Sequence, residues 1–200
     1  MKTVVIILAI AFAAVTAGCA SNYKMVDLSY EKSVNAKGGT GDLFIANPIE
    51  KHGASKLPSG VTVIGNVKNS DVLVATKDSI SEWVMTSLMH EFYSAGYNVK
   101  TAPELPADVT KGIKVIITKI FANQIPEEMV VKDETVIGID VEVWKEGKLI
   151  KTLTFENKNE GKGLRRTAGL ISVMLKRTLQ DIVQQIVPNV MKTLAEDARQ

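Results

Sequence analysis

The sequence predicts an α+β domain in which two helices pack on one face of a mainly antiparallel sheet, in the order β-β-α-β-β-β-α. Residues 135–144 alternate apolar and polar side chains, and residues 148–155 return after the short turn Glu146-Gly147. This period and turn are typical of an antiparallel hairpin. Residues 80–95 and the C-terminal segment instead repeat apolar residues every three or four positions, as helices do. Helices and strands that do not alternate regularly favour the α+β class.

The first two strands are short. Residues 43–46 form an apolar run that ends at Asn47-Pro48, and residues 61–67 form a second run after the loop 52–60. β-Branched residues bounded by turn-forming residues predict strands.

The first helix has clear signals at both ends. Asp78 or Ser79 can cap it, because a short side-chain oxygen accepts from the free amides of the first turn. Gly96 ends it, since the left-handed C-terminal position favours glycine. The apolar stripe consists of Ile80, Val84, Leu88 and Phe92.

Three further strands are predicted over residues 114–121, 135–144 and 148–155. In the middle strand, the apolar residues at odd positions face the core. Gly138, Asp140, Glu142 and Trp144 lie on the opposite face. Period-two alternation predicts that this second face meets solvent.

The chain then continues as a polar loop over residues 156–166, and Thr167 caps a long final helix. Pro188 lies inside that helix and predicts a kink, because proline removes one amide donor and clashes with the preceding turn. The stripe of this helix consists of Leu175, Leu179, Ile182, Ile186, Val190 and Leu194.

The N-terminus has the organisation of a bacterial lipoprotein signal. Lys2 precedes an apolar run over residues 4–15, and small residues lead to Cys19, the single cysteine of the chain. The run is shorter than the about 20 residues of a membrane-spanning helix, and the order of charge, apolar run and small residues indicates a signal peptide. We expect Cys19 to be acylated with fatty acids such as palmitate. An ordinary signal peptide with a free thiol is the competing interpretation, since Thr16 stands where leucine is usual.

Three segments follow from this interpretation: a signal peptide over residues 1–18, a lipidated N-terminus and tether over 19–40, and a periplasmic domain over 41–200. The tether is rich in Ser, Asn, Lys and Gly. An alternative for its first half is a docked strand, because Met25, Val26, Leu28 and Tyr30 are apolar or aromatic.

Charge and reactive residues argue against several classes of function. The 24 basic and 22 acidic residues nearly balance, which does not indicate a nucleic-acid-binding protein. His52 and His90 are the two histidines, too few for a metal site without cysteines. Asp140 and Glu142 are better explained as solvated strand residues than as a catalytic pair. We therefore expect no enzyme activity, no cofactor and no metal.

Three residues are candidates for partner binding. Trp144 lies on the polar face of its strand, and Arg165 and Arg166 follow the glycine-rich residues 161–163. Trp and Arg are enriched among the residues that dominate binding energy at interfaces. A covered tryptophan and a solvated loop are the competing interpretations.

The chain resembles the YajG-type family of bacterial lipoproteins. The resemblance rests on the TAGC signal at 16–19, VTVIGNV at 61–67, and KDSISEWVMTSLMHEFYSAGYNV at 77–99, with the hairpin and closing helix beyond. It implies an anchored periplasmic domain and supplies no catalytic residue. Weaker likenesses are to auxiliary lipoproteins of envelope lipid transporters and to lipoprotein activators of cell-wall synthases.

The predicted function is that of a non-enzymatic binding or accessory module of the cell envelope. It is held in the membrane by the lipid at Cys19, faces the periplasm and binds an envelope protein. Ala20 favours the outer membrane, because lipoproteins retained at the inner membrane usually carry aspartate there. The alternative is a lipid-handling auxiliary lipoprotein of an envelope transporter, which requires an apolar groove between sheet and helices.

Overall fold

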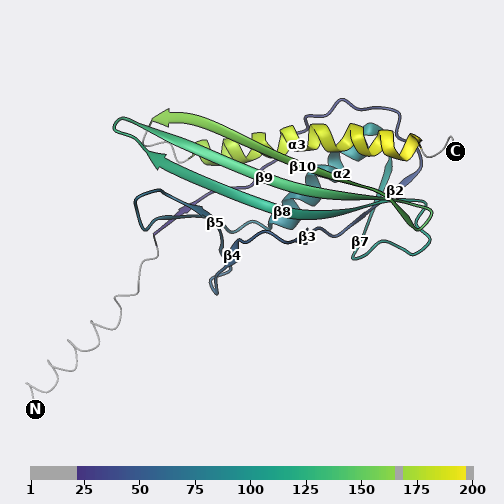
Figure 1. Cartoon of the computed structure of the whole chain (residues 1–200), viewed down its shortest axis with the longest axis horizontal. Coiled ribbons are helices and arrows are strands. Elements are labelled where there is room, and N and C mark those ends of the chain that lie inside the picture. The colour runs from purple at the N-terminus through teal and green to yellow at the C-terminus, as the bar shows by residue number, and fades with distance from the viewer. Residues whose placement is uncertain (1–21, 165–168, 197–200) are drawn as a thin grey trace, which may run out of the picture.

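A computed structural model describes residues 22–164 and 169–196 (Figure 1). It confirms the α+β class, with two helices and two mixed sheets in the described part. The helices are α2 (Ile80–Ala95) and α3 (Gly169–Glu196). The strands are β1 (Tyr23–Met25), β2 (Asp42–Ala46), β3 (Ile49–Glu50), β4 (Ser55–Lys56), β5 (Thr62–Asn66), β6 (Leu73–Thr76), β7 (Asn98–Ala102), β8 (Lys111–Pro126), β9 (Val130–Lys145) and β10 (Lys148–Leu164).

The larger sheet is built on three long antiparallel strands, β8, β9 and β10, which span 16, 16 and 17 residues. Its order is β10-β9-β8-β2-β7, with β3 also paired to β8. β2 runs parallel to both of its neighbours. Figure 1 shows the three long strands as a ribbon that runs nearly the length of the molecule, with α3 lying along it.

The buried face of this ribbon forms the core together with the helices. The odd-numbered residues of β9 predicted to face inward are buried, and Ile139, Val141 and Val143 have no exposed surface. α3 packs on β9 and β10. Leu88 and Phe92 of α2 are likewise fully buried in the same cluster. Among the described residues, no helix has the length and apolarity needed to cross a bilayer.

Both predicted ends of α2 are confirmed. The Ser79 hydroxyl accepts from the amide of Glu82, and Gly96 adopts the left-handed conformation at φ 108°. A side chain at Gly96 would also meet the carbonyl oxygen of Gly39 at 2.6 Å. Glycine is therefore required here by conformation and by close backbone packing.

The polar loop predicted over residues 156–166 is wrong as far as Leu164. β10 continues to that residue and pairs with β9 as far as Val130. Whether a segment forms a strand depends on the neighbouring strand as well as on the segment itself. Residues 156–164 have little intrinsic strand preference but become a strand because β9 is long enough to pair with them. Cys19, Arg165, Arg166 and the cap residue Thr167 lie outside the described residues.

Of the two interpretations of residues 19–40, the docked strand is the one seen for β1. Tyr23–Met25 pairs in parallel with β6, in a smaller sheet of order β1-β6-β5-β4. The residues that follow also pack on the domain, so a tether does not extend to residue 40. The division into signal peptide and lipidated N-terminus stays a prediction.

Candidate functional site

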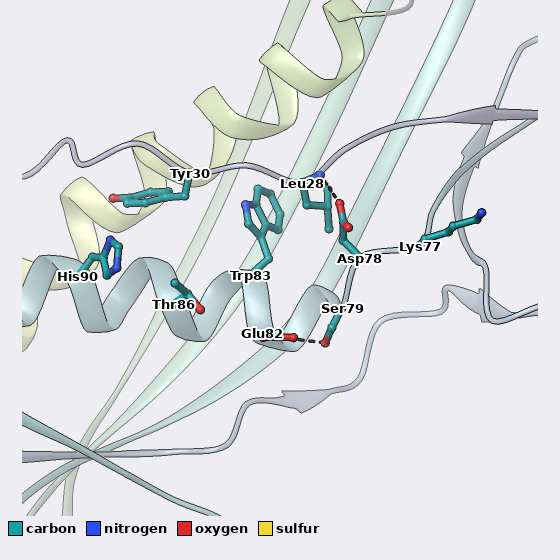
Figure 2. Close-up of a pocket in the computed structure, with 9 residues that line it drawn as sticks. All are labelled: Leu28, Tyr30, Lys77, Asp78, Ser79, Glu82, Trp83, Thr86 and His90. Atoms are coloured by element: carbon teal, nitrogen blue, oxygen red, sulfur yellow. Dashed lines mark hydrogen bonds between the residues drawn. The ribbon is translucent and has the colours of Figure 1, made fainter.

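Residues 26–36, named the strap here, contact side chains of both α2 and α3, and Figure 2 shows Leu28 and Tyr30 of the strap beside α2. Val26 and Val34 are buried, and Leu28 and Tyr30 are half-buried between them. Inward-facing residues thus alternate, as in a strand. The Val26 amide still donates to the Ala75 carbonyl of β6 at 2.9 Å, and the residues after it belong to no strand. The strap is held mainly by side chains of the two helices.

Glu91 of α2 makes the densest of these contacts. It is 1% exposed. Its Oε1 accepts from the Tyr30 hydroxyl at 2.6 Å and from the Ser33 amide, and its Oε2 accepts from the Val34 amide at 3.2 Å. Burial and this carboxylate raise the pKa of Tyr30 well above its ordinary value, because both disfavour the phenolate.

Other side chains hold the strap along both edges. The Trp83 indole donates to the Ser29 carbonyl at 2.9 Å, and Asp78 accepts from the Leu28 amide at 2.7 Å. From α3, Gln180 donates to the Glu31 carbonyl at 2.8 Å, and Gln184 to the Ser33 carbonyl at 3.4 Å. The helix groove therefore binds the chain's own N-terminal segment much as it would bind an extended peptide.

A hollow of about 580 Å³ remains beside the strap at the N-terminal end of α2. Figure 2 shows its lining: Leu28, Tyr30, Lys77, Asp78, Ser79, Glu82, Trp83, Thr86 and His90. Asp78 is already occupied by the strap and Ser79 by the helix amide. His90 is exposed, as expected for a solvated helix position. Two of the polar groups that line the hollow therefore already have partners within the chain, and we do not treat the hollow as a ligand site.

The stronger candidate is a cleft of about 350 Å³ beside Trp144, on the sheet face opposite α3. Trp144 is half-buried, and its indole nitrogen donates to Oε2 of Glu142 at 3.2 Å. The lining is mainly apolar: Ala46, Asn47, Ile49, Pro103, Glu104, Leu105, Pro106, Ala107, Lys114, Trp144 and Gly147.

The loop 103–110 forms one wall of this cleft and partly covers the tryptophan. The Gly147 amide donates to the Val109 carbonyl at 3.0 Å, which ties the loop to the turn between β9 and β10. Gly147 has φ 71°, and an added Cβ would lie 2.2 Å from the Ala107 carbonyl oxygen. The loop can approach this closely only because position 147 lacks a side chain.

The residues that line the cleft are better suited to binding an apolar segment of a partner than to catalysing a reaction. Its charged groups, Lys114 and Glu104, are single and of opposite sign. In the part of the chain that the structure describes, no three His, Cys, Asp or Glu side chains gather as a metal site would require. Prolines and leucine beside a half-buried indole form the kind of surface that buries an aromatic or aliphatic side chain of a partner.

The structure describes one of the three predicted partner-binding residues, Trp144. Trp144 pairs with Leu149, at the start of β10, whereas Leu164 at its end immediately precedes Arg165. These two ends of β10 are roughly 50 Å apart at about 3.3 Å per residue. Glu156 of the same strand pairs with Gly138, six residues from Trp144. Whether Arg165 and Arg166 share a surface with Trp144 is not tested by the described residues, so their role stays a prediction.

Two features escaped the sequence-based predictions. Glu91 follows Leu88 by three positions and Val84 by seven, so its place on the apolar stripe was a visible sign of a buried carboxylate. The wall 103–107 was visible only as Pro103 and Pro106 in a loop. Nothing local indicated that this loop would fold over Trp144.

Comparison with known proteins places the chain by fold. No protein-family model and no curated protein matches the sequence. The crystal structure of protein XCC0632 from Xanthomonas campestris, described under the family DUF330, superposes with a TM-score of 0.62 at 9% identity. The match covers 89% of this chain and 99% of that one. The two proteins therefore share a fold.

Two bacterial lipoproteins are similar at lower scores. A minor lipoprotein from Acinetobacter baumannii has a TM-score of 0.42 at 8% identity, covering 78% of this chain and 94% of its own. Lipoprotein GNA1162 from Neisseria meningitidis has a TM-score of 0.35 at 10% identity, covering 74% and 99%. These superpositions are too loose to define a common fold.

Proposed function

We propose that this protein is a YajG-like lipoprotein, anchored at Cys19 in the outer membrane, whose periplasmic domain binds an envelope protein at the Trp144 cleft. It acts as a non-enzymatic binding or accessory module. The observation that carries the binding role is the half-buried indole of Trp144 in an open apolar cleft beside Leu105 and Ile49.

The position of the cleft suits a protein anchored at its N-terminus. Lys24 in β1 donates to Gln124, which donates to Asp133 near the start of β9. Trp144 lies roughly 35 Å farther along β9, at about 3.3 Å per residue. In Figure 1 the chain enters the described domain near one end of the sheet, and the β9–β10 turn lies at the other. The cleft therefore stays accessible when the N-terminus is held at a membrane.

The lipid-handling alternative has less support. It requires an apolar groove between sheet and helices, but the side chains there pack on one another. Ile139 of β9, Leu179 of α3 and Leu88 of α2 have no exposed surface. An acyl chain could enter this interface only if the helices moved apart.

The anchor is tested by Cys19→Ala, with Ser21→Ala as the matched control. We expect the Cys19 variant to incorporate no radiolabelled palmitate and to leave the membrane fraction, while the control does both normally. Retention of the Cys19 variant in the membrane would contradict lipid anchoring.

The cleft is tested by photocrosslinking in the intact envelope. A photoreactive residue at Leu105, on the cleft wall, is expected to capture one defined protein, and Trp144→Ala is expected to abolish that capture. Tyr93→Ala is the control, because Tyr93 is a 73% exposed aromatic on α2, away from the cleft. Equal capture by the Trp144 variant, with an unchanged melting curve, would remove the cleft from the proposal.

Arg165→Ala with Arg166→Ala is scored in the same assay. We expect weaker capture without loss of thermal stability, because solvated charges contribute little to folding. Full capture by this double variant would leave the two arginines as solvated residues.

A further inference from the structure

The outer edge of β10 is a long strand edge without a partner among the described residues. β10 has 17 residues and ends the larger sheet, paired only with β9. Figure 1 shows it along the border of the sheet. An edge of this length presents a row of backbone donors and acceptors that another strand can pair with.

The exposed face of this edge alternates in charge. Glu156, Lys158, Glu160 and Lys162 occupy every second position and are all exposed. On their inner side they pair with neighbouring strands: Lys119 with Glu156 at 3.1 Å, Lys132 with Glu160 at 2.7 Å, and Lys158 with Glu134. Lys158 also pairs with Glu160 at 3.0 Å, and Lys162 with Glu127 at 3.4 Å, and all four residues remain exposed to solvent.

We propose that two copies of this chain associate through their β10 edges, antiparallel and two-fold symmetric about Asn159. Residues whose numbers are equally far from 159 then lie opposite each other. Lys158 faces Glu160 of the second copy, and Glu156 faces Lys162, which gives four complementary pairs across the interface. Opposite charges in directly facing positions stabilise a strand pair.

The alternation selects this register. Moving one strand by two residues places Lys158 opposite Lys158, or Glu160 opposite Glu160, which is destabilising. Moving it by four residues restores opposite charges but leaves half as many pairs. An odd shift turns the charged face of one strand to the buried face of the other sheet. A second copy is thus the occupant that the charges fit best.

The other face of the edge is compatible with the same register. Asn157 would lie opposite Gly161, and Phe155 opposite Gly163, so each larger side chain faces a glycine. Cross-strand packing of an aromatic ring over a glycine is a favourable arrangement in sheets. Asn159, at the axis, is held by Asp181 of α3 at 2.9 Å.

The symmetry also suits two anchored chains. The two-fold axis of an antiparallel strand pair is perpendicular to the sheet, so both copies keep the same sheet face on the same side. The Gln124 side chain accepts a hydrogen bond from Lys24 of β1. Gln124 of β8 is paired with Asp133 of β9, which is paired in turn with Gly161 of β10. Gly161 is two residues from the axis, so both N-terminal strands lie near the centre of the dimer. Restriction to one membrane surface raises the effective concentration of such partners.

Charge exchange in the full-length lipidated protein tests the proposal, by sedimentation in detergent micelles. One variant, Glu156→Lys with Glu160→Lys, has only lysines on the edge; another, Lys158→Glu with Lys162→Glu, has only glutamates. Each is expected to self-associate at least about tenfold more weakly than the parent, because four favourable pairs become like-charged pairs. Mixing the two variants is expected to restore the dimer. Glu82→Lys with Asp108→Lys, both exposed and away from the edge, is the control for net charge and is expected to dimerise normally.

A third variant tests the register and keeps the charge count. Lys158→Glu with Glu160→Lys preserves all four complementary pairs about Asn159, so this variant is expected to dimerise like the parent, whereas Lys158→Glu alone is not. Melting curves show whether each variant is folded, and recovery in the mixture cannot come from misfolded chains. A monomeric parent protein, single-sign variants that dimerise normally, or a mixture that stays monomeric would each overturn the proposal. In those cases the alternating charges serve to keep the edge unpaired.

Discussion

The strap and the C-terminal half of β10, residues 156–164, have similar compositions. They are held in the domain by different interactions. Both segments are rich in polar residues; a tether, with a docked strand as the alternative, was predicted for the first, and a loop for the second. In the structure both are ordered parts of the domain. The strap rests on a few side chains from two helices, whereas residues 156–164 rest on a continuous backbone ladder with β9.

This difference predicts how each segment responds to substitution. The carboxylate of Glu91 accepts three hydrogen bonds from the strap, so removing it affects three donors at once. The β10 ladder does not depend on any one side chain, and its ion pairs lie at the surface. The strap is therefore the segment that a single substitution can release.

The largest expected effect is that of Glu91→Ala. Two amides and one phenol lose their acceptor, and we expect the free energy of unfolding to fall by about 2–4 kcal/mol, since an unsatisfied buried donor costs about 1–3 kcal/mol. Urea unfolding measures the loss, and amide hydrogen exchange is expected to accelerate at Ser33 and Val34 first. Glu82→Ala, exposed on the same helix, is the control. An unchanged exchange rate at Val34 would show that the strap does not depend on Glu91.

A smaller effect is expected for Tyr30→Phe, which removes one donor to Glu91 and keeps the ring. The cost is about 1.5–3 kcal/mol, the range for one hydrogen bond to a charged group. The variant also differs in pH dependence. The pKa of Tyr30 is raised in the folded state, so its contribution is complete below the ordinary value near 10 and is lost as pH rises further. Stability measured from pH 8 to 11 should therefore fall less steeply in the variant, and parallel curves would contradict the assignment.

The smallest effect is expected for Lys158→Ala. Lys158 is exposed and pairs with Glu134 and Glu160, and the backbone ladder is unaffected by its removal. We expect the urea midpoint at pH 7 to stay within experimental error, because exposed ion pairs contribute little.

The same variant is also expected to differ from the parent in how its stability changes at low pH. Lys132 and Lys158 lower the pKa of Glu160 to about 2, so this contribution is present above the ordinary value near 4.5 and is lost as pH falls towards 2. In Lys158→Ala that acid-induced loss should be smaller only by the same small amount that the variant loses at pH 7, because the two quantities are linked. A large loss of stability at pH 7 would instead mean that β10 depends on its charged side chains, and the comparison with the strap would fail.

Features set by neighbouring residues were predictable. The Ser79 cap and the left-handed Gly96 were confirmed, because both depend on hydrogen bonds within a few residues. The hairpin around Glu146-Gly147 was predicted for the same reason, since the turn brings adjacent strands together. The α+β class follows from such elements.

Features that depend on distant residues were not predictable. Tyr30 and Glu91 are 61 positions apart, and Gln184 and Ser33 are 151 apart. The alternation of Val26, Leu28 and Tyr30 was visible in the sequence, but the groove that receives them was not.

The amino-acid sequence alone therefore decides the class of the fold, the ends of α2 and the inward face of β9, because local sterics and period-two or helical burial specify them. The tertiary structure decides that residues 26–36 form a strap, that 156–164 form a strand, and that the loop 103–110 makes a cleft beside Trp144. Each of these depends on which surface the rest of the chain presents, and that surface exists only once the domain has folded.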